Sequence, residues 1–104
     1  GAVAHTVGRL MRQLGSQRQV LAVTHLAQVA ACADRHLLVS KITECGSTHS
    51  DVRPIEGQAR IVEVARMLGG HADSKASLAH AREMLECVDN GQAPELQLGE
   101  LAAP

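Results

Sequence analysis

The 104-residue chain contains no phenylalanine, tyrosine or tryptophan. Aromatic side chains normally supply much of the apolar area that a protein core buries. Here leucine, valine, isoleucine, alanine and methionine must supply it, although hydrophobic residues make up an ordinary 45% of the chain. A chain this short also buries only a modest share of its surface. We therefore expect one small domain with a thin core, as in a part of a larger body.

An excess of charge of either sign is also missing, because the formal net charge is −1. No overall field therefore attracts nucleic acid or an anionic membrane, and there are no aromatic platforms for stacking bases. No apolar run approaches the length of a membrane span, and the first residues do not resemble a signal peptide. The composition argues against a membrane protein and against DNA binding by this chain alone.

Paired cysteines are a third absence. Cys32, Cys45 and Cys87 are odd in number and widely spaced, which argues against a disulfide framework and fits reduced thiols in the cytoplasm. The chain has no CxxC motif and its six histidines are scattered, so we predict no metal site. Cys32 follows His25 by about two helical turns, roughly 10 Å, which is too far for a hydrogen-bonded Cys–His pair.

The most informative stretch that is present is QVLAVTHLAQV, residues 19–29. Four apolar residues, Val20 to Val23, run directly into Thr24 and His25. A short continuous apolar run is typical of a buried, parallel-type strand, because a strand covered on both faces shows no alternation. Apolar residues at helical spacing follow. We predict a strand over 19–23, a tight polar turn, and a helix over 25–33.

The pattern leaves two interpretations of His25 open. In open α/β sheets ligands sit beyond the carboxyl ends of the strands, where this side chain would project. An imidazole there can donate a hydrogen bond to a phosphate or to an attacking water. Alternatively, Thr24 only caps the next helix through its hydroxyl group, and His25 is an ordinary surface histidine.

Further helices are predicted around this unit. Helical periodicity indicates helices over 1–15, over 56–68 and from Ser74 or Ser77 to 88. The expected apolar stripes are Val3, Val7, Leu10 and Leu14 in the first, Ile61, Val64, Ala65 and Leu68 in the second, and Leu78, Ala81, Leu85 and Val88 in the third. The charged residues Arg9, Arg12, Arg60, Glu63 and Arg66 are predicted on solvated faces.

An antiparallel hairpin is predicted between residues 36 and 53. Leu37 and Val39 alternate with Leu38, Ser40 and Ile42, so one face of the first strand is expected to be better buried. The sequence ECGS at 44–47 supplies turn residues, with Gly46 able to adopt a positive φ. Pro54 lacks a backbone donor and is expected to end the return strand.

Three segments together resemble a known family. VTHLAQVAA at 23–31 resembles the His-switch segment of SMC-like ABC ATPases. With ARMLGG at 65–70 and LAHAREML at 78–85, it resembles the C-terminal end of the RecN family of DNA-repair ATPases. The segments stand in the family's order at similar separations, and the resemblance covers residues 1 to about 88. The chain departs from the family at Ala27, where a proline is usual.

The resemblance implies an α/β fold: the C-terminal portion of a P-loop NTPase head of the ABC or SMC-like type. It implies one parallel-type strand, an antiparallel hairpin and about four helices over residues 1–88, with 89–104 as a flexible tail. It also implies that His25 is the switch histidine that contacts the γ-phosphate of ATP, with Thr24 as a supporting neighbour. The intact parent would bind ATP and Mg²⁺, form a homodimer of heads, and act on DNA double-strand breaks in the cytoplasm, associated with the nucleoid.

The chain itself lacks the other parts of such an ATPase. It has no GxxxxGK[ST] loop, no apolar strand ending in paired acids and no LSGG-like motif. A P-loop hydrolase needs a phosphate cradle, a lysine, a Mg²⁺ ligand and a carboxylate that orients water. We therefore expect no ATP hydrolysis, no measurable ATP affinity and no cofactor in this chain alone. The upstream half of the head would be its partner, and without it an unpaired sheet edge should lead to self-association.

One alternative from another class stays open: a freestanding α/β protein-interaction module with no catalytic role. The first predicted helix has no N-cap residue before it, which favours a chain that begins inside a longer protein. The two hypotheses differ in whether the natural reading frame extends upstream into a Walker B strand, a long coiled coil and a Walker A loop.

Overall fold

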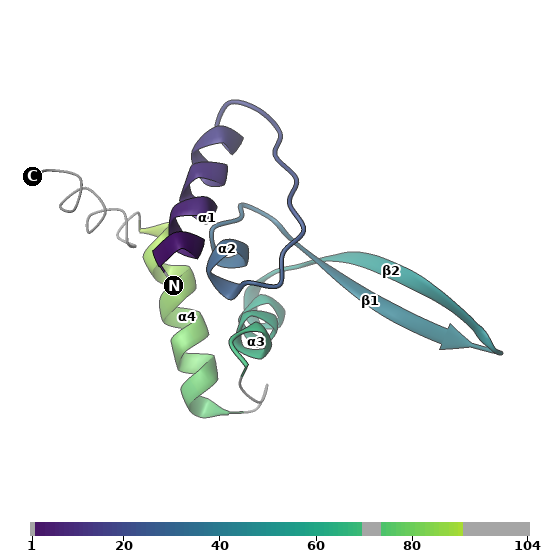
Figure 1. Cartoon of the computed structure of the whole chain (residues 1–104). Helices are drawn as coiled ribbons and strands as arrows, with labels where there is room; N and C mark the ends of the chain where they lie inside the picture. The colour runs from purple at the N-terminus through teal and green to yellow at the C-terminus, as the bar shows by residue number, and fades with distance from the viewer. Residues whose placement is uncertain (1, 70–73, 91–104) are drawn as a thin grey trace, which may run out of the picture.

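A computed structural model describes residues 2–69 and 74–90. It contains four helices and one antiparallel hairpin, as predicted: α1 (Ala2–Gly15), α2 (Ala27–Ala31), β1 (His36–Glu44), β2 (Ser47–Ile55), α3 (Gly57–Met67) and α4 (Lys75–Asp89). The helices gather into one body, and the hairpin projects away from them (Figure 1). Residues 70–73, which fall in and just before the loop predicted over 71–75, and most of the predicted tail, 91–104, lie outside the described residues.

The core lies where α2, α3 and α4 meet. Val64, Ala65 and Ala81 are fully buried, with Ala27 beside them, and the surrounding apolar residues are Ile61, Met67, Leu68, Leu78, Met84 and Leu85. The apolar stripes predicted for the second and third long helices are therefore confirmed. Val64 is the largest fully buried side chain among the described residues, which confirms the expectation of a thin core.

The boundaries of α3 and α4 follow from local backbone chemistry. Gly69 takes a φ of +87° directly after the C-cap of α3, a conformation that terminates helices and that glycine adopts without a steric penalty. At the start of α4 the hydroxyl of Ser74 accepts a hydrogen bond from the backbone N–H of Ser77 at 3.4 Å. This satisfies one of the N–H groups that have no partner within the helix.

The predicted strand over 19–23 is not formed. These residues lie on the irregular connection between α1 and α2 without strand pairing, and Leu21 and Val23 are 80% and 98% exposed. A parallel strand needs a neighbouring strand to satisfy its backbone, and the only sheet in the described part of the chain is the hairpin. The helix predicted over 25–33 is also shorter, because α2 covers only Ala27–Ala31.

The observed hairpin confirms the predicted antiparallel pairing, but its second strand, β2, extends further than predicted. Cys45 and Gly46 form a two-residue turn with φ values of 49° and 81°, which suits a type I′ turn. In such a hairpin the pair that closes the turn is hydrogen-bonded and the pairs then alternate. Counting from that pair, Leu37 and Pro54 form a non-hydrogen-bonded pair. The nitrogen of Pro54 faces the open edge, where no donor is needed, so β2 continues to Ile55.

Helix α1 packs on α2 through small residues rather than through its apolar stripe. Ala4 and Gly8 are its buried positions, whereas Val3, Leu10 and Leu14 are 78%, 55% and 51% exposed. A Cβ on Gly8 would lie 2.8 Å from the Sγ of Cys32 and 3.2 Å from the carbonyl oxygen of Gln28. Glycine at this position therefore permits the close approach of the two helices.

This contact predicts that Gly8→Ala destabilises the chain by about 1–2 kcal/mol. Overpacking typically costs about 1–3 kcal/mol, while the gain in helix propensity returns up to about 1 kcal/mol. Urea denaturation measures the difference in free energy of unfolding. The matched control is Gly8→Ala introduced into a Cys32→Ala chain. Removal of the Sγ atom should reduce the cost of Gly8→Ala in free energy of unfolding. A Gly8→Ala variant more stable than the unaltered chain would contradict this account.

Candidate functional site

Thr24 and His25 lie next to each other on the connection between α1 and α2. The Oγ1 atom of Thr24 accepts a hydrogen bond from the backbone N–H of Leu26 at 3.0 Å. This bond closes a turn just before the helix, so Thr24 is not the N-cap of α2; that residue is Leu26, which makes no side-chain cap bond. The side chain of His25 is exposed. It is thus held by a local turn and is open to a ligand.

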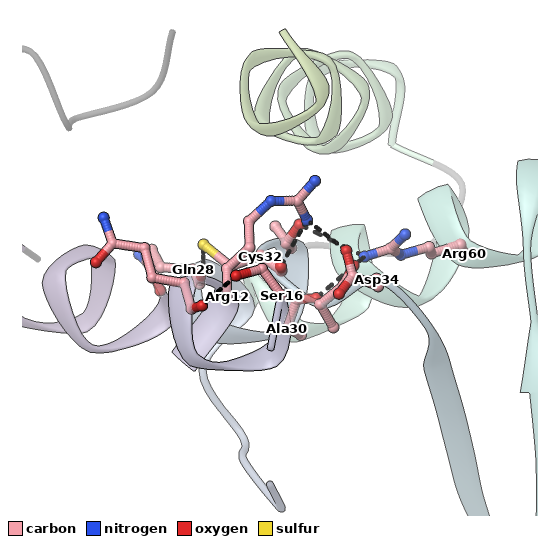
Figure 2. A network of polar contacts seen from close by, with 10 residues as sticks. Arg12, Ser16, Gln28, Ala30, Cys32, Asp34 and Arg60 are labelled. Carbon is pink, nitrogen blue, oxygen red and sulfur yellow. Dashed lines mark hydrogen bonds and ion pairs between the residues drawn. The ribbon is translucent and has the colours of Figure 1, made fainter. Parts of the chain in front are cut away.

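The opposite end of α2 is held by two arginines from other helices. A terminal nitrogen of Arg60 on α3 lies 3.2, 3.4 and 2.8 Å from the carbonyl oxygens of Ala30, Ala31 and Ala33. Arg12 on α1 donates to the carbonyl oxygen of Cys32 at 2.9 Å, and Figure 2 shows the two guanidinium groups approaching this end of α2. The last carbonyl groups of a helix lack partners within it and favour cations nearby. We call these contacts the arginine clamp.

The charge of Arg60 is only partly compensated by nearby carboxylates. Its guanidinium is half-buried, and this burial lowers its pKa, while the carboxylate of Asp89 acts in the opposite direction. An arginine still stays protonated near neutral pH, so its bonds to the carbonyl groups are charge-assisted. Asp34, just after α2, is paired with Arg12 at 3.3 Å. The clamp therefore joins α1, α2 and α3 through charged groups.

The prediction of solvated faces is wrong for Arg12 and Arg60, and also for Glu63. Glu63 is buried, with 9% of its surface exposed, and is ion-paired with Arg66. A signal for Arg60 was present in the sequence. It stands four residues before the fully buried Val64, on the same side of α3.

His36 begins β1, where the hairpin leaves the helical body. Its Nδ1 atom is buried without a hydrogen-bond partner. Burial lowers the pKa of His36, the charge of Arg60 lowers it further, and Glu63 partly opposes them. The lowered pKa means that this position, near Arg60 of the arginine clamp, disfavours the charged form of the imidazole.

The described part of the chain contains neither a cluster of metal ligands nor a helix that could span a membrane. Across residues 2–69 and 74–90, no three side chains of His, Cys, Asp or Glu cluster so as to hold a metal ion. No helix in these ranges has the length and apolar character needed to cross a membrane. His25 and the turn formed by Thr24 remain the candidate site.

Comparison with known proteins agrees with the resemblance seen in the sequence. No model of a known protein family matches the chain. The chain is 48% identical over 86 residues to the DNA repair protein RecN of Streptomyces coelicolor, 45% over 85 to that of Vibrio cholerae, and 51% over 85 to that of Deinococcus radiodurans. Each match covers 82–83% of this chain and 15% of the relative.

These identities relate the chain to bacterial DNA repair proteins. In particular, it belongs to the RecN family and matches the C-terminal part of its members. The chain spans about 15% of the length of the curated relatives that it matches.

The environment of His36 predicts a pH dependence of stability. Because its pKa is lower in the folded chain than the usual 6.5, the unfolded chain binds more protons between those two values. The free energy of unfolding should therefore fall as the pH drops from about 6.5 towards the folded-state pKa. Urea denaturation between pH 7 and pH 5 should show a weaker decline for His36→Gln.

His49→Gln is the matched control, since His49 is an exposed histidine on the hairpin. It should leave the pH dependence of the free energy of unfolding in place. Some dependence should also remain in His36→Gln, because burial lowers the pKa of His5 too. Identical pH profiles for His36→Gln and the unaltered chain would contradict the assignment.

Proposed function

We propose that this chain is the C-terminal part of an SMC-like, P-loop ATPase head in which His25 senses the γ-phosphate of ATP. One observation carries the proposal: an exposed and mainly apolar segment without strand pairing, 19–23, ends two residues before the exposed His25. A central strand that lacks its neighbouring strands would be an apolar run without sheet pairing. Residues 20–23 have this character in the chain alone. Membership of the RecN family supports the proposal that the rest of the parent supplies this sheet.

The exposed stripe of α1 supports the same conclusion. Val3, Val7, Leu10 and Leu14 face solvent although they lie on one side of an amphipathic helix. Exposed apolar patches of this kind mark surfaces that are covered by a partner. This stripe and the segment 19–23 are consecutive in the chain, so the upstream half of the head is the natural cover for both. Residues 1–88 would then form the head portion, with 89–104 as a tail.

The chemistry assigned to His25 is limited to what an imidazole can do. With no hydrogen bond from the described residues, its ring is free to donate to a phosphate oxygen or to the attacking water. Thr24 holds the turn beside it. The phosphate cradle, the Mg²⁺ ligand and the carboxylate that orients water would come from the rest of the parent, which binds ATP and Mg²⁺. This chain alone should therefore not hydrolyse ATP.

The parent would act in the repair of DNA double-strand breaks, with two heads forming a homodimer and DNA bound through the parent rather than through this chain. In isolation the uncovered segment 19–23 and the α1 stripe should lead to self-association. A freestanding interaction module is the less favourable alternative, because it does not explain why the RecN match extends through His25.

The test is ATP turnover by this chain mixed with the upstream remainder of its parent. Turnover should appear only in the mixture, and His25→Ala should lower it by about 10²-fold, the lower end of the usual cost of removing one hydrogen-bond donor that stabilises the reacting charge. The matched control is His80→Ala, because His80 is an exposed histidine on α4. It should leave turnover unchanged. Full turnover by His25→Ala in a mixture shown to associate would contradict the proposal.

A further inference from the structure

We propose that Arg60 is a positioning residue for His25 and acts through α2. The inference rests on the proposed function of His25. Arg60 does not need to touch the nucleotide, because its guanidinium binds the carbonyl groups of Ala30, Ala31 and Ala33 at the far end of α2. The helix begins two residues after His25.

Helix α2 depends on contacts with other elements. It has five residues, and a helix of this length is not stable on its own in water. Its N-cap, Leu26, makes no side-chain cap bond. Packing of Ala27 and Ala31 in the two apolar clusters and the arginine clamp at its C-terminal end therefore hold it in place.

The position of α2 in turn determines the position of His25. Upstream, the sheet of the parent would hold residues 19–23, so α2 fixes the downstream side of the histidine turn. Downstream, the hydrogen bond from Leu26 N–H to Thr24 Oγ1 connects the histidine turn directly to the start of α2. A shift of α2 is thus transmitted to His25. Misplacement of a reacting group by about 1 Å can cost on the order of 10²-fold in rate.

Arg60 carries more of this role than Arg12. One nitrogen of Arg60 faces three carbonyl oxygens, and the guanidinium is half-buried. Arg12 binds one carbonyl group of this end and shares its charge with Asp34. Buried charge-assisted bonds are stronger than exposed ones. Lysine at position 60 would keep the charge but not the planar guanidinium group.

The experiment measures steady-state ATP turnover of the intact parent that contains this chain. Arg60→Ala should lower kcat by about 10-fold, while KM for ATP changes by less than about twofold, since the interactions that bind ATP remain. Arg60→Lys should recover part of the loss. Arg82→Ala is the matched control, because Arg82 is an exposed arginine on α4, and it should change neither constant.

A double-mutant cycle separates positioning from a general structural effect. If Arg60 acts through His25, adding Arg60→Ala to His25→Ala should lower kcat no further. Losses that multiply, or unchanged kcat in Arg60→Ala, would overturn the inference. Should Arg60→Ala fail to fold, Arg60→Lys replaces it in the same cycle with the same criterion. Unchanged turnover in His25→Ala would instead refute the proposed function, and the positioning role with it.

Discussion

Two arginine side chains bind the carbonyl groups at the C-terminal end of α2, because this five-residue helix leaves part of their hydrogen-bonding capacity unused. Arg60 reaches them from α3 and Arg12 from α1, so two helices distant in sequence are joined at one point. The same helix buries Ala27 and Ala31 against α3 and α4. The apolar core is small, and these polar contacts join the helices of the body beside it.

The uneven burial of the apolar residues has one physical explanation. On α1, the small residues Ala4 and Gly8 face the helical body, whereas the larger Leu10 faces solvent. Val23, which follows this helix, is also exposed. A domain that is stable by itself normally buries its larger apolar side chains, because the free energy gained grows with the apolar area removed from water. The arrangement fits a piece whose larger apolar surface is reserved for the rest of an ATPase head, as proposed from its RecN relatives.

Elements whose stability is local or depends on neighbouring parts of this chain could be predicted from the sequence. The stripes of α3 and α4 and the turn at Cys45–Gly46 follow from periodicity and turn chemistry. The absence of the predicted strand over 19–23 could not be foreseen, because a strand requires a partner and the residue pattern carries no information about whether that partner is present. The position of Thr24 and His25 at a turn was predicted, but their role stays a prediction. The role of Arg60 was missed because periodicity indicates its side of α3 but not which carbonyl groups of α2 lie there.

The most direct test of the account is amide hydrogen exchange at Gln19–Val23, measured in this chain alone and in the intact parent. If the segment is a strand that lacks its sheet, its amides should exchange rapidly in isolation, and in the parent they should be protected as strongly as a central strand. Such a result would place His25 at the end of a formed strand. Rapid exchange in both would contradict the claim that the head completes this segment.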